Sequence, residues 1–143
     1  MVRFNPTDKN FKSITGALQE DKPFLMAVEI EKNINANNVF LCFHKDGEED
    51  ILRRYMPLVS SDDTHNRYQI KINFPFKGLY FYYFEIETGW GKKYVCPSAS
   101  LDGVWCDEVY AQYQLTVFRP DKNKANWFHW LAFSGYSQSK SMP

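Results

Sequence analysis

The residues of this 143-residue chain that could do acid–base or metal chemistry are few and scattered. Its three histidines, His44, His65 and His129, have no cysteine or carboxylate at a metal-ligand spacing, and the sequence contains no HExxH or CxxC pair. His44 lies in an apolar run, where a surface or hydrogen-bonded histidine is the ordinary expectation. Glycine-rich phosphate loops are also absent. The sequence therefore predicts no metal site and no cofactor.

Two further groups contain catalytic residue types without the arrangement that catalysis needs. The segment from Ser60 to His65 holds serine, aspartate and histidine, but a triad needs groups that converge from separate elements, and these share one polar stretch. Glu29 with Glu31, and Glu85 with Glu87, stand at alternate positions of predicted strands. Such pairs usually mark a solvated strand face rather than the paired carboxylates of a glycosidase. We predict no catalytic residue.

Aromatic residues are the better candidates for function, since they make up 17% of the chain. A flat ring on a rigid strand or turn can stack on the apolar C–H face of a sugar while neighbouring polar groups bind its hydroxyls. Trp90, held between Gly89 and Gly91, is the most exposed candidate, and Tyr94 and Trp105 are the other two. The alternative is that these rings fill a hydrophobic core or cover its end.

The segment Gly78–Glu87 is the element around which the rest is organised. With a period of two, Tyr80, Tyr82, Phe84 and Ile86 share one face, which predicts a strand at the centre of a sheet that packs on a second layer. The opposite face carries Phe81 and Tyr83, more aromatic area than a solvated face needs. We expect these two rings to pack beneath another domain or loop.

Similar alternation recurs along the chain and predicts an all-β fold. Strands are expected within residues 24–31, 39–45, 51–56, 68–74, 92–96 and 112–118, with an edge strand at residues 2–4 and loops at 60–66 and 97–109. Turn-forming Gly, Pro, Asn and Asp separate them. Seven to eight short strands joined in this way are typical of an antiparallel β-sandwich.

Composition limits the class of partner. Lys plus Arg and Asp plus Glu number 17 each, so the chain lacks the basic footprint of a nucleic-acid binder and a polybasic membrane patch. No apolar run approaches a membrane span, and the N-terminus has no signal core, which predicts a cytoplasmic protein. Three cysteines without a framework spacing argue against a disulfide scaffold; Cys42 is expected to be a buried hydrophobe, and Cys96 and Cys106 bracket a loop across which they could pair.

Three motifs in order resemble a known domain type. They are Phe4-Asn5-Pro6 with Lys12-Ser13 and Gly16-Ala17, then Gly78–Glu87, then Tyr113–Phe118 followed by Trp127. Over residues 2–130 the chain resembles the N-terminal immunoglobulin-like domain of family 13 glycoside hydrolases, in the neopullulanase, cyclomaltodextrinase and maltogenic-amylase group. In that group the domain is classed as a carbohydrate-binding module of family 34. It packs against the catalytic barrel of its own or a partner subunit and can bind α-glucan weakly.

The resemblance implies an immunoglobulin-like sandwich over residues 1–120 and a linker over residues 121–143. It also implies a non-catalytic accessory module of an enzyme that acts on α-glucans such as pullulan. The sequence departs from the family after Trp127, where Phe128–Tyr136 replaces the expected entry into a (β/α)8 barrel, and at Ile14, where the family usually has proline. The catalytic carboxylates of the family lie in the barrel, so none transfers to this chain. The Ser-rich stretch 134–143 is expected to be frayed.

Two alternatives remain beside this interpretation. One is a stand-alone starch- or glycogen-binding domain, which adheres to polysaccharide. The other is an immunoglobulin-like protein-interaction domain with no sugar ligand, which burial of Trp90, Tyr94 and Trp105 would favour.

Overall fold

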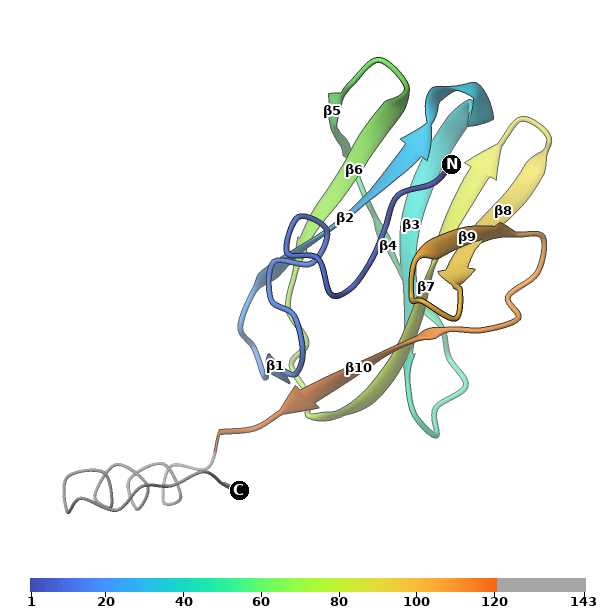
Figure 1. The fold of residues 1–143 in the computed structure, drawn as a ribbon. Coiled ribbons are helices and arrows are strands. Elements are labelled where there is room, and N and C mark those ends of the chain that lie inside the picture. The colour runs from blue at the N-terminus through green and yellow to red at the C-terminus, as the bar shows by residue number, and fades with distance from the viewer. Residues whose placement is uncertain (121–143) are drawn as a thin grey trace.

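The computed structural model describes residues 1–120, which form two β-sheets packed face to face (Figure 1). The smaller sheet has the order β2-β6-β5, and the larger has the order β1-β10-β7-β3-β4, with β8 on β7 and β9 on β8. The bounds in the smaller sheet are β2 Phe24–Glu31, β5 Leu58–Ser61 and β6 His65–Ile72. Those in the larger sheet are β1 Leu18–Gln19, β3 Ala36–Lys45, β4 Leu52–Tyr55, β7 Gly78–Thr88, β8 Gly91–Pro97, β9 Gly103–Cys106 and β10 Tyr113–Phe118.

The strand β7 lies at the centre of the larger sheet, as its pattern predicts. One edge pairs with β3 along nearly its whole length, and the other pairs first with β10 and then with β8. The inward set is buried as expected: Tyr80, Tyr82, Phe84 and Ile86 are all at most 5% exposed. The alternation of β7 thus gave the correct faces.

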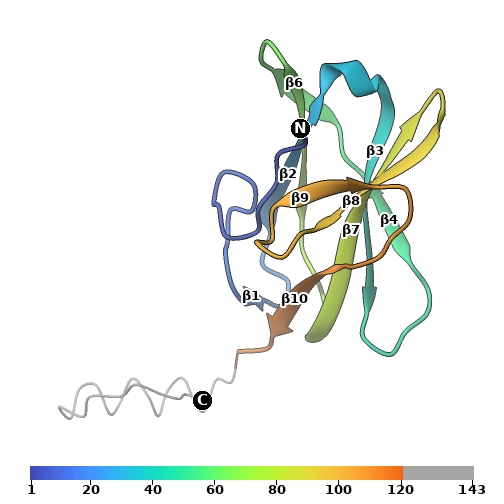
Figure 2. The same cartoon turned by 45° about the vertical axis from the view of Figure 1, so that its right-hand side comes forward.

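Aromatic rings dominate the core between the sheets. Tyr82 stacks on Tyr113 with ring centroids 5.1 Å apart, and Phe4 packs edge-on against Phe84 at 4.8 Å and Tyr113 at 5.0 Å. Because Phe4 comes from the N-terminal segment, this segment closes one side of the core. Figure 2 shows it crossing beside β2 and β9.

The edge strand expected at residues 2–4 is only a single isolated bridge, and a second one follows further along the N-terminal segment. Arg3 and Lys12 each form a single antiparallel bridge, to Glu29 and Met26 of β2. Lys12 is nevertheless buried, and its ammonium group donates to the carbonyl oxygens of Ile14 at 2.8 Å and Gly16 at 3.3 Å. Burial lowers the pKa of Lys12 to about 8.

The antiparallel β-sandwich is confirmed, and the strand count, one pairing direction and one strand boundary differ from the prediction. The described residues hold ten strands rather than seven to eight, because β1, β5 and β9 were not predicted, while the edge strand expected at residues 2–4 is absent from them. Of these, β5 and β9 lie in or overlap the predicted loops 60–66 and 97–109. The pairing of β1 with β10 is parallel. A short 3-10 turn, Lys32–Ile34, precedes β3, which starts three residues before the predicted Val39.

Other predictions lie outside residues 1–120. These are the linker at residues 121–143, Trp127 and the fraying of Ser134–Pro143. Within residues 1–120, no helix has the length and apolar character to cross a membrane.

Candidate functional site

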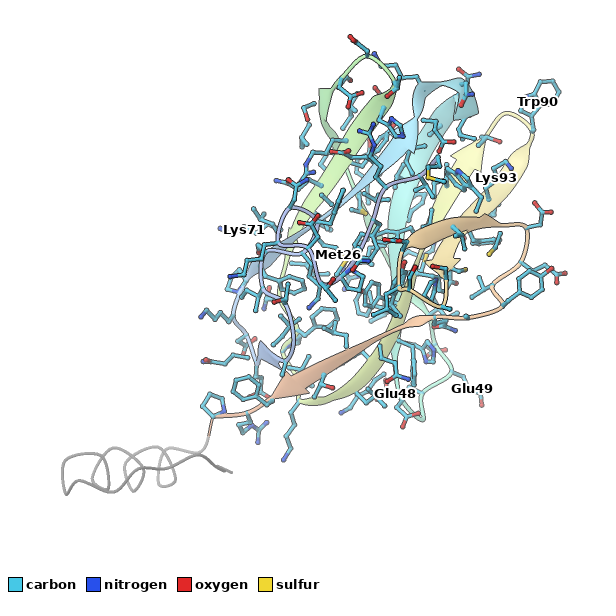
Figure 3. All side chains as sticks on the ribbon, viewed as in Figure 1. Met26, Glu48, Glu49, Lys71, Trp90 and Lys93 are labelled. Carbon is cyan, nitrogen blue, oxygen red and sulfur yellow. The ribbon has the colours of Figure 1, made fainter. Side chains whose placement is uncertain are left out.

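Trp90 stands at the tip of the β7–β8 hairpin (Figure 3). Thr88 fixes the turn, since its Oγ1 accepts from the Trp90 N–H at 3.1 Å and donates to the carbonyl of Gly91 at 2.8 Å. Gly91 has φ +120°, a backbone angle that side chains disfavour. The indole itself is 93% exposed. A large apolar ring is therefore held in water on a turn whose backbone is already ordered.

Tyr94 and Trp105 do not share a platform with each other. In the β8–β9 ladder Tyr94 lies opposite Cys106, while Trp105 lies opposite Val95, so the two rings project from opposite faces of the sheet. The Trp105 indole N–H donates to Glu31 Oε1 at 2.9 Å, and its ring packs against the core. This contact joins the two sheets. Only Trp90 of the three candidates is fully presented to solvent.

The outer face of the larger sheet buries Tyr83 without a second domain. Tyr83 is 7% exposed and meets Tyr94 edge-on, with ring centroids 5.8 Å apart. Beside them Glu85, at 6% exposed, accepts a hydrogen bond of 2.5 Å from Arg53. The Arg53 guanidinium also lies 3.9 Å from the centroid of the Phe40 ring. Side chains from neighbouring strands of the same sheet thus cover Tyr83 and Glu85 on this outer face.

Sequence reasoning missed Arg53 and Phe40 as members of this cluster. They meet Glu85 because Phe40 lies opposite Glu85 across β3 and β7, and because Arg53 on β4 lies opposite Cys42, the second residue after Phe40 on β3. Each residue comes from a different strand, so only the strand register could have brought them together.

Phe81, the other predicted packing residue, is only half-buried. The His44 ring stacks on it at 5.6 Å, which places this histidine on the sheet surface as expected. A shallow hollow of about 360 Å³ adjoins the two rings and is lined by the loop Val109–Gln112. Tyr110 in this loop is largely exposed. Phe81 therefore lies beside a loop, with part of its ring accessible.

The residues with catalytic side chains have structural contacts instead. Asp62 accepts hydrogen bonds from the backbone N–H groups of Thr64 and His65 and forms an ion pair with Arg3. These contacts stabilise the carboxylate and hold the pKa of Asp62 well below its usual range. His65 is buried and contacts Thr64 Oγ1 and the carbonyl of Met1. The bonds of Asp62 to Thr64 and His65 close the turn between β5 and β6, and the contacts with Arg3 and Met1 hold that turn against the N-terminal segment.

The three cysteines are free thiols. Cys96 and Cys106 lie on the neighbouring strands β8 and β9, but no disulfide joins them. Burial raises the pKa of Cys42 and of Cys96 to about 11, so both are protonated at neutral pH. Within residues 1–120, no cluster of histidine, cysteine and carboxylate residues could hold a metal ion.

Comparison with known proteins yields a likeness of fold. No protein-family model matches the chain, and no curated protein matches its sequence. Among solved structures, a cyclomaltodextrinase superposes with a TM-score of 0.59 at 13% identity over 83% of this chain. A carbohydrate-binding module of the muscle glycogen-targeting subunit of protein phosphatase-1 superposes with a TM-score of 0.47 at 14% identity, over 71% of this chain and 73% of that one.

The first likeness bears on the resemblance drawn from the sequence. The chain spans about a fifth of the length of the cyclomaltodextrinase that it matches. At 13% identity the match shows a similar arrangement of the strands and does not show a shared activity. Residues 1–120 therefore have the β-sandwich fold found in a part of cyclomaltodextrinase.

Proposed function

We propose that this chain is a non-catalytic accessory module that accompanies an α-glucan-acting glycoside hydrolase of the alpha-amylase family and binds α-glucan weakly through Trp90. The fold shared with part of a cyclomaltodextrinase supports the class of protein. The three sequence motifs support the same class independently of the superposition.

The observation that carries the binding role is the exposed indole at the β7–β8 tip. Trp90 is 93% exposed, and Thr88 fixes the turn that presents it. A sugar ring that stacks on this indole would remove apolar surface from water on both sides. Because the turn is already ordered, binding would cost little backbone entropy. Tyr94 and Trp105 lie on opposite faces of the sheet and form no shared platform, so a single exposed ring would give weak binding.

A packing role is supported by a second observation on the outer face of the larger sheet. Phe81 and Tyr110 leave apolar area uncovered beside a shallow hollow. A catalytic barrel of the same or a partner subunit is the partner proposed for this face. Tyr83 is already buried by its own sheet, so its part in such an interface would be small.

Native affinity electrophoresis tests the binding role. The chain would run through gels that contain pullulan, amylopectin or cellulose, with Trp90→Ala alongside. We expect retardation by the two α-glucans only, and a loss of about 1–3 kcal/mol of binding free energy in the variant, as for other stacking residues.

The variant Tyr110→Ala serves as the matched control, since it also removes a largely exposed aromatic ring. Equal retardation of Trp90→Ala and the parent chain would refute the stacking role. Retardation in no gel would leave packing against a barrel as the role to be tested.

A further inference from the structure

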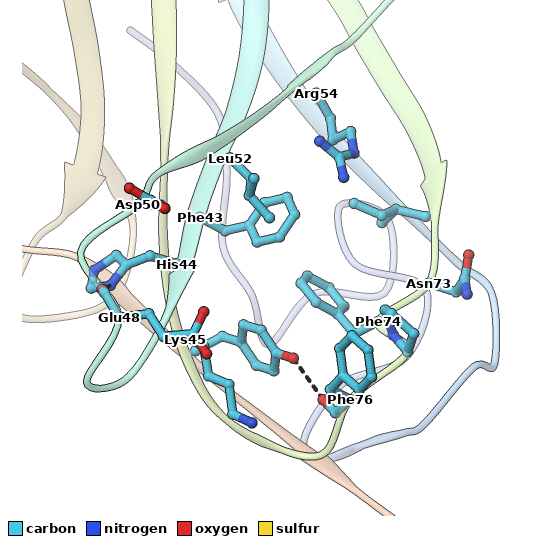
Figure 4. Close-up of a pocket in the computed structure, with 13 residues that line it drawn as sticks. Phe43, His44, Lys45, Glu48, Asp50, Leu52, Arg54, Asn73, Phe74 and Phe76 are labelled. Atoms are coloured by element: carbon cyan, nitrogen blue, oxygen red, sulfur yellow. Dashed lines mark hydrogen bonds between the residues drawn. The ribbon is translucent and has the colours of Figure 1, made fainter.

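A pocket opens between the two sheets at the end of the molecule opposite Trp90. Figure 3 shows Trp90 at one end and Glu48, at the pocket, at the other. Its volume is about 570 Å³, which lies in the range of about 300–1,000 Å³ that small-molecule sites occupy. Figure 4 shows its walls, formed by the end of β3, by β4 and by the connection from β6 to β7.

The pocket exists because the chain changes sheets between β4 and β5. The Met56 N–H donates to the Val39 carbonyl in the larger sheet, and the Pro57 carbonyl accepts from the Gln69 N–H in the smaller one. In the described part of the chain, β5 pairs with β6 only from Asn66 to Tyr68. The remainder of β6 and the edge strand β4 therefore leave the space between the sheets open.

The floor of the pocket is aromatic. The Phe74 ring lies 5.0 Å from Phe43 and 4.9 Å from Tyr80 between centroids. Phe76 stands at the mouth and is 64% exposed. Phe43, Phe74 and Tyr80 are each at most 5% exposed and close the floor, so the ring that a ligand can stack on is Phe76.

The mouth of the pocket has a fixed backbone. Tyr80 Oη donates to the Phe76 carbonyl at 2.6 Å, and the Lys77 N–H donates to Glu20 Oε2 at 3.0 Å. Gly78, with φ +144°, lets the Lys45 side chain cross it, because an added Cβ would stand 2.5 Å from Lys45 Cε. The backbone that carries Phe76 is therefore ordered before any ligand arrives, which lowers the entropic cost of binding.

The charges at the pocket balance. Lys45 and Arg54 supply two cations, and Glu48 and Asp50 supply two carboxylates. Within residues 1–120 none of the four takes part in an ion pair. One Arg54 N–H donates to the Arg53 carbonyl at 3.1 Å, and the remaining donors and acceptors of the four side chains are available to a ligand. Their charges sum to zero, which favours a neutral ligand over a phosphate or a cation. An oligosaccharide has this chemistry, since it is neutral, carries many hydroxyl groups and presents apolar C–H faces.

We propose that this pocket is a second carbohydrate site, which takes an α-1,4-linked glucan chain with one sugar ring stacked on Phe76. The choice of α-glucan over other sugars rests on the proposed function; the pocket itself does not depend on Trp90. Arg54, 5.4 Å from the Phe43 ring, and Asp50 would bind hydroxyls of the stacked chain. Two sites at opposite ends would let one molecule contact two glucan chains.

Amide chemical shifts of the full chain, titrated with maltoheptaose, test this proposal. We expect shifts at residues 45–54 and 74–77, and a dissociation constant at these amides that rises about tenfold or more in Phe76→Ala. Since Phe76 is largely exposed, this variant should fold. Arg54→Gln, which keeps a polar side chain but loses the charge, should raise the dissociation constant measured at the same amides. Tyr110→Ala is the matched control and should not.

The outcomes separate the two sites. Pocket shifts that persist in Trp90→Ala support the pocket whether or not Trp90 binds. Shifts at Trp90 alone refute the pocket and leave the proposed function standing. Equal shifts with cellohexaose, a β-1,4-linked chain, overturn the choice of α-glucan. Shifts of the pocket amides with protein concentration, in the absence of sugar, would assign the pocket to a second copy of the chain and overturn the proposal.

Discussion

The two faces of β7 are covered by different means. Inward, Tyr82 and Phe84 meet a second sheet and the ring of Phe4, so each is enclosed by another layer. Outward, Tyr83 and Glu85 have low exposure as well, but their cover consists of side chains from neighbouring strands of the same sheet. Equal burial can therefore reflect a closed core or a surface sheltered by its neighbours, and the free energies of unfolding should distinguish them.

Tyr82→Ala should have the largest effect. Removing a ring that is 0% exposed between two layers leaves a cavity, and such truncations cost about 3–5 kcal/mol. Urea unfolding followed by tryptophan fluorescence would measure the loss. An unchanged midpoint would mean that the faces of β7 are reversed.

Tyr83→Ala, the neighbouring residue on the other face, should cost less. Water can enter the space that the outer ring leaves, so the cavity contribution is absent and the loss should be about 1.5–3 kcal/mol, the value of burying one large side chain. The same unfolding curves give the comparison. A loss as large as that of Tyr82→Ala would show that the outer face is enclosed in solution, as it would be in a self-associated chain.

Tyr82→Phe should have the smallest effect and an unusual sign. The Tyr82 hydroxyl is buried with no hydrogen-bond partner among the described residues, so removing it should leave stability unchanged or raise it by up to about 1 kcal/mol. Tyr113→Phe is the matched control in the stacked ring. Its hydroxyl donates to the Leu101 carbonyl at 3.0 Å, and its removal should cost about 1 kcal/mol. Equal losses in both variants would mean that Tyr82 has a partner.

The sequence predicted the central strand well because its signal is local. Alternation in Gly78–Glu87 is a property of ten consecutive residues, and the pleat turns it directly into two faces. The strands β5 and β9 escaped prediction for the opposite reason. Each is four residues long, too short for an alternating apolar pattern to stand out, and β5 is also exposed throughout. Their pairing partners define them.

The candidate site was predicted only in part, for the same physical reason. Trp90 could be placed at a tip because the glycines on either side of it, Gly89 and Gly91, mark a turn. The Trp105 indole, by contrast, meets Glu31 at 74 positions of separation, and no local pattern encodes that contact. The pocket beside Phe76 could not be predicted from the sequence, since it forms where the two sheets leave a space between them.

The parallel pairing of β1 with β10 bears on how the chain is made. Arg119, just after β10, pairs with Glu20, just after β1, at a separation of 99 positions, so these contacts close only when most of the domain has left the ribosome. Until β10 arrives, the Gly78–Tyr82 edge of β7 has no partner on that side. An unpaired aromatic edge is a template for pairing with other chains. Nascent or truncated forms that lack β10 should therefore need chaperone protection that the complete sandwich does not.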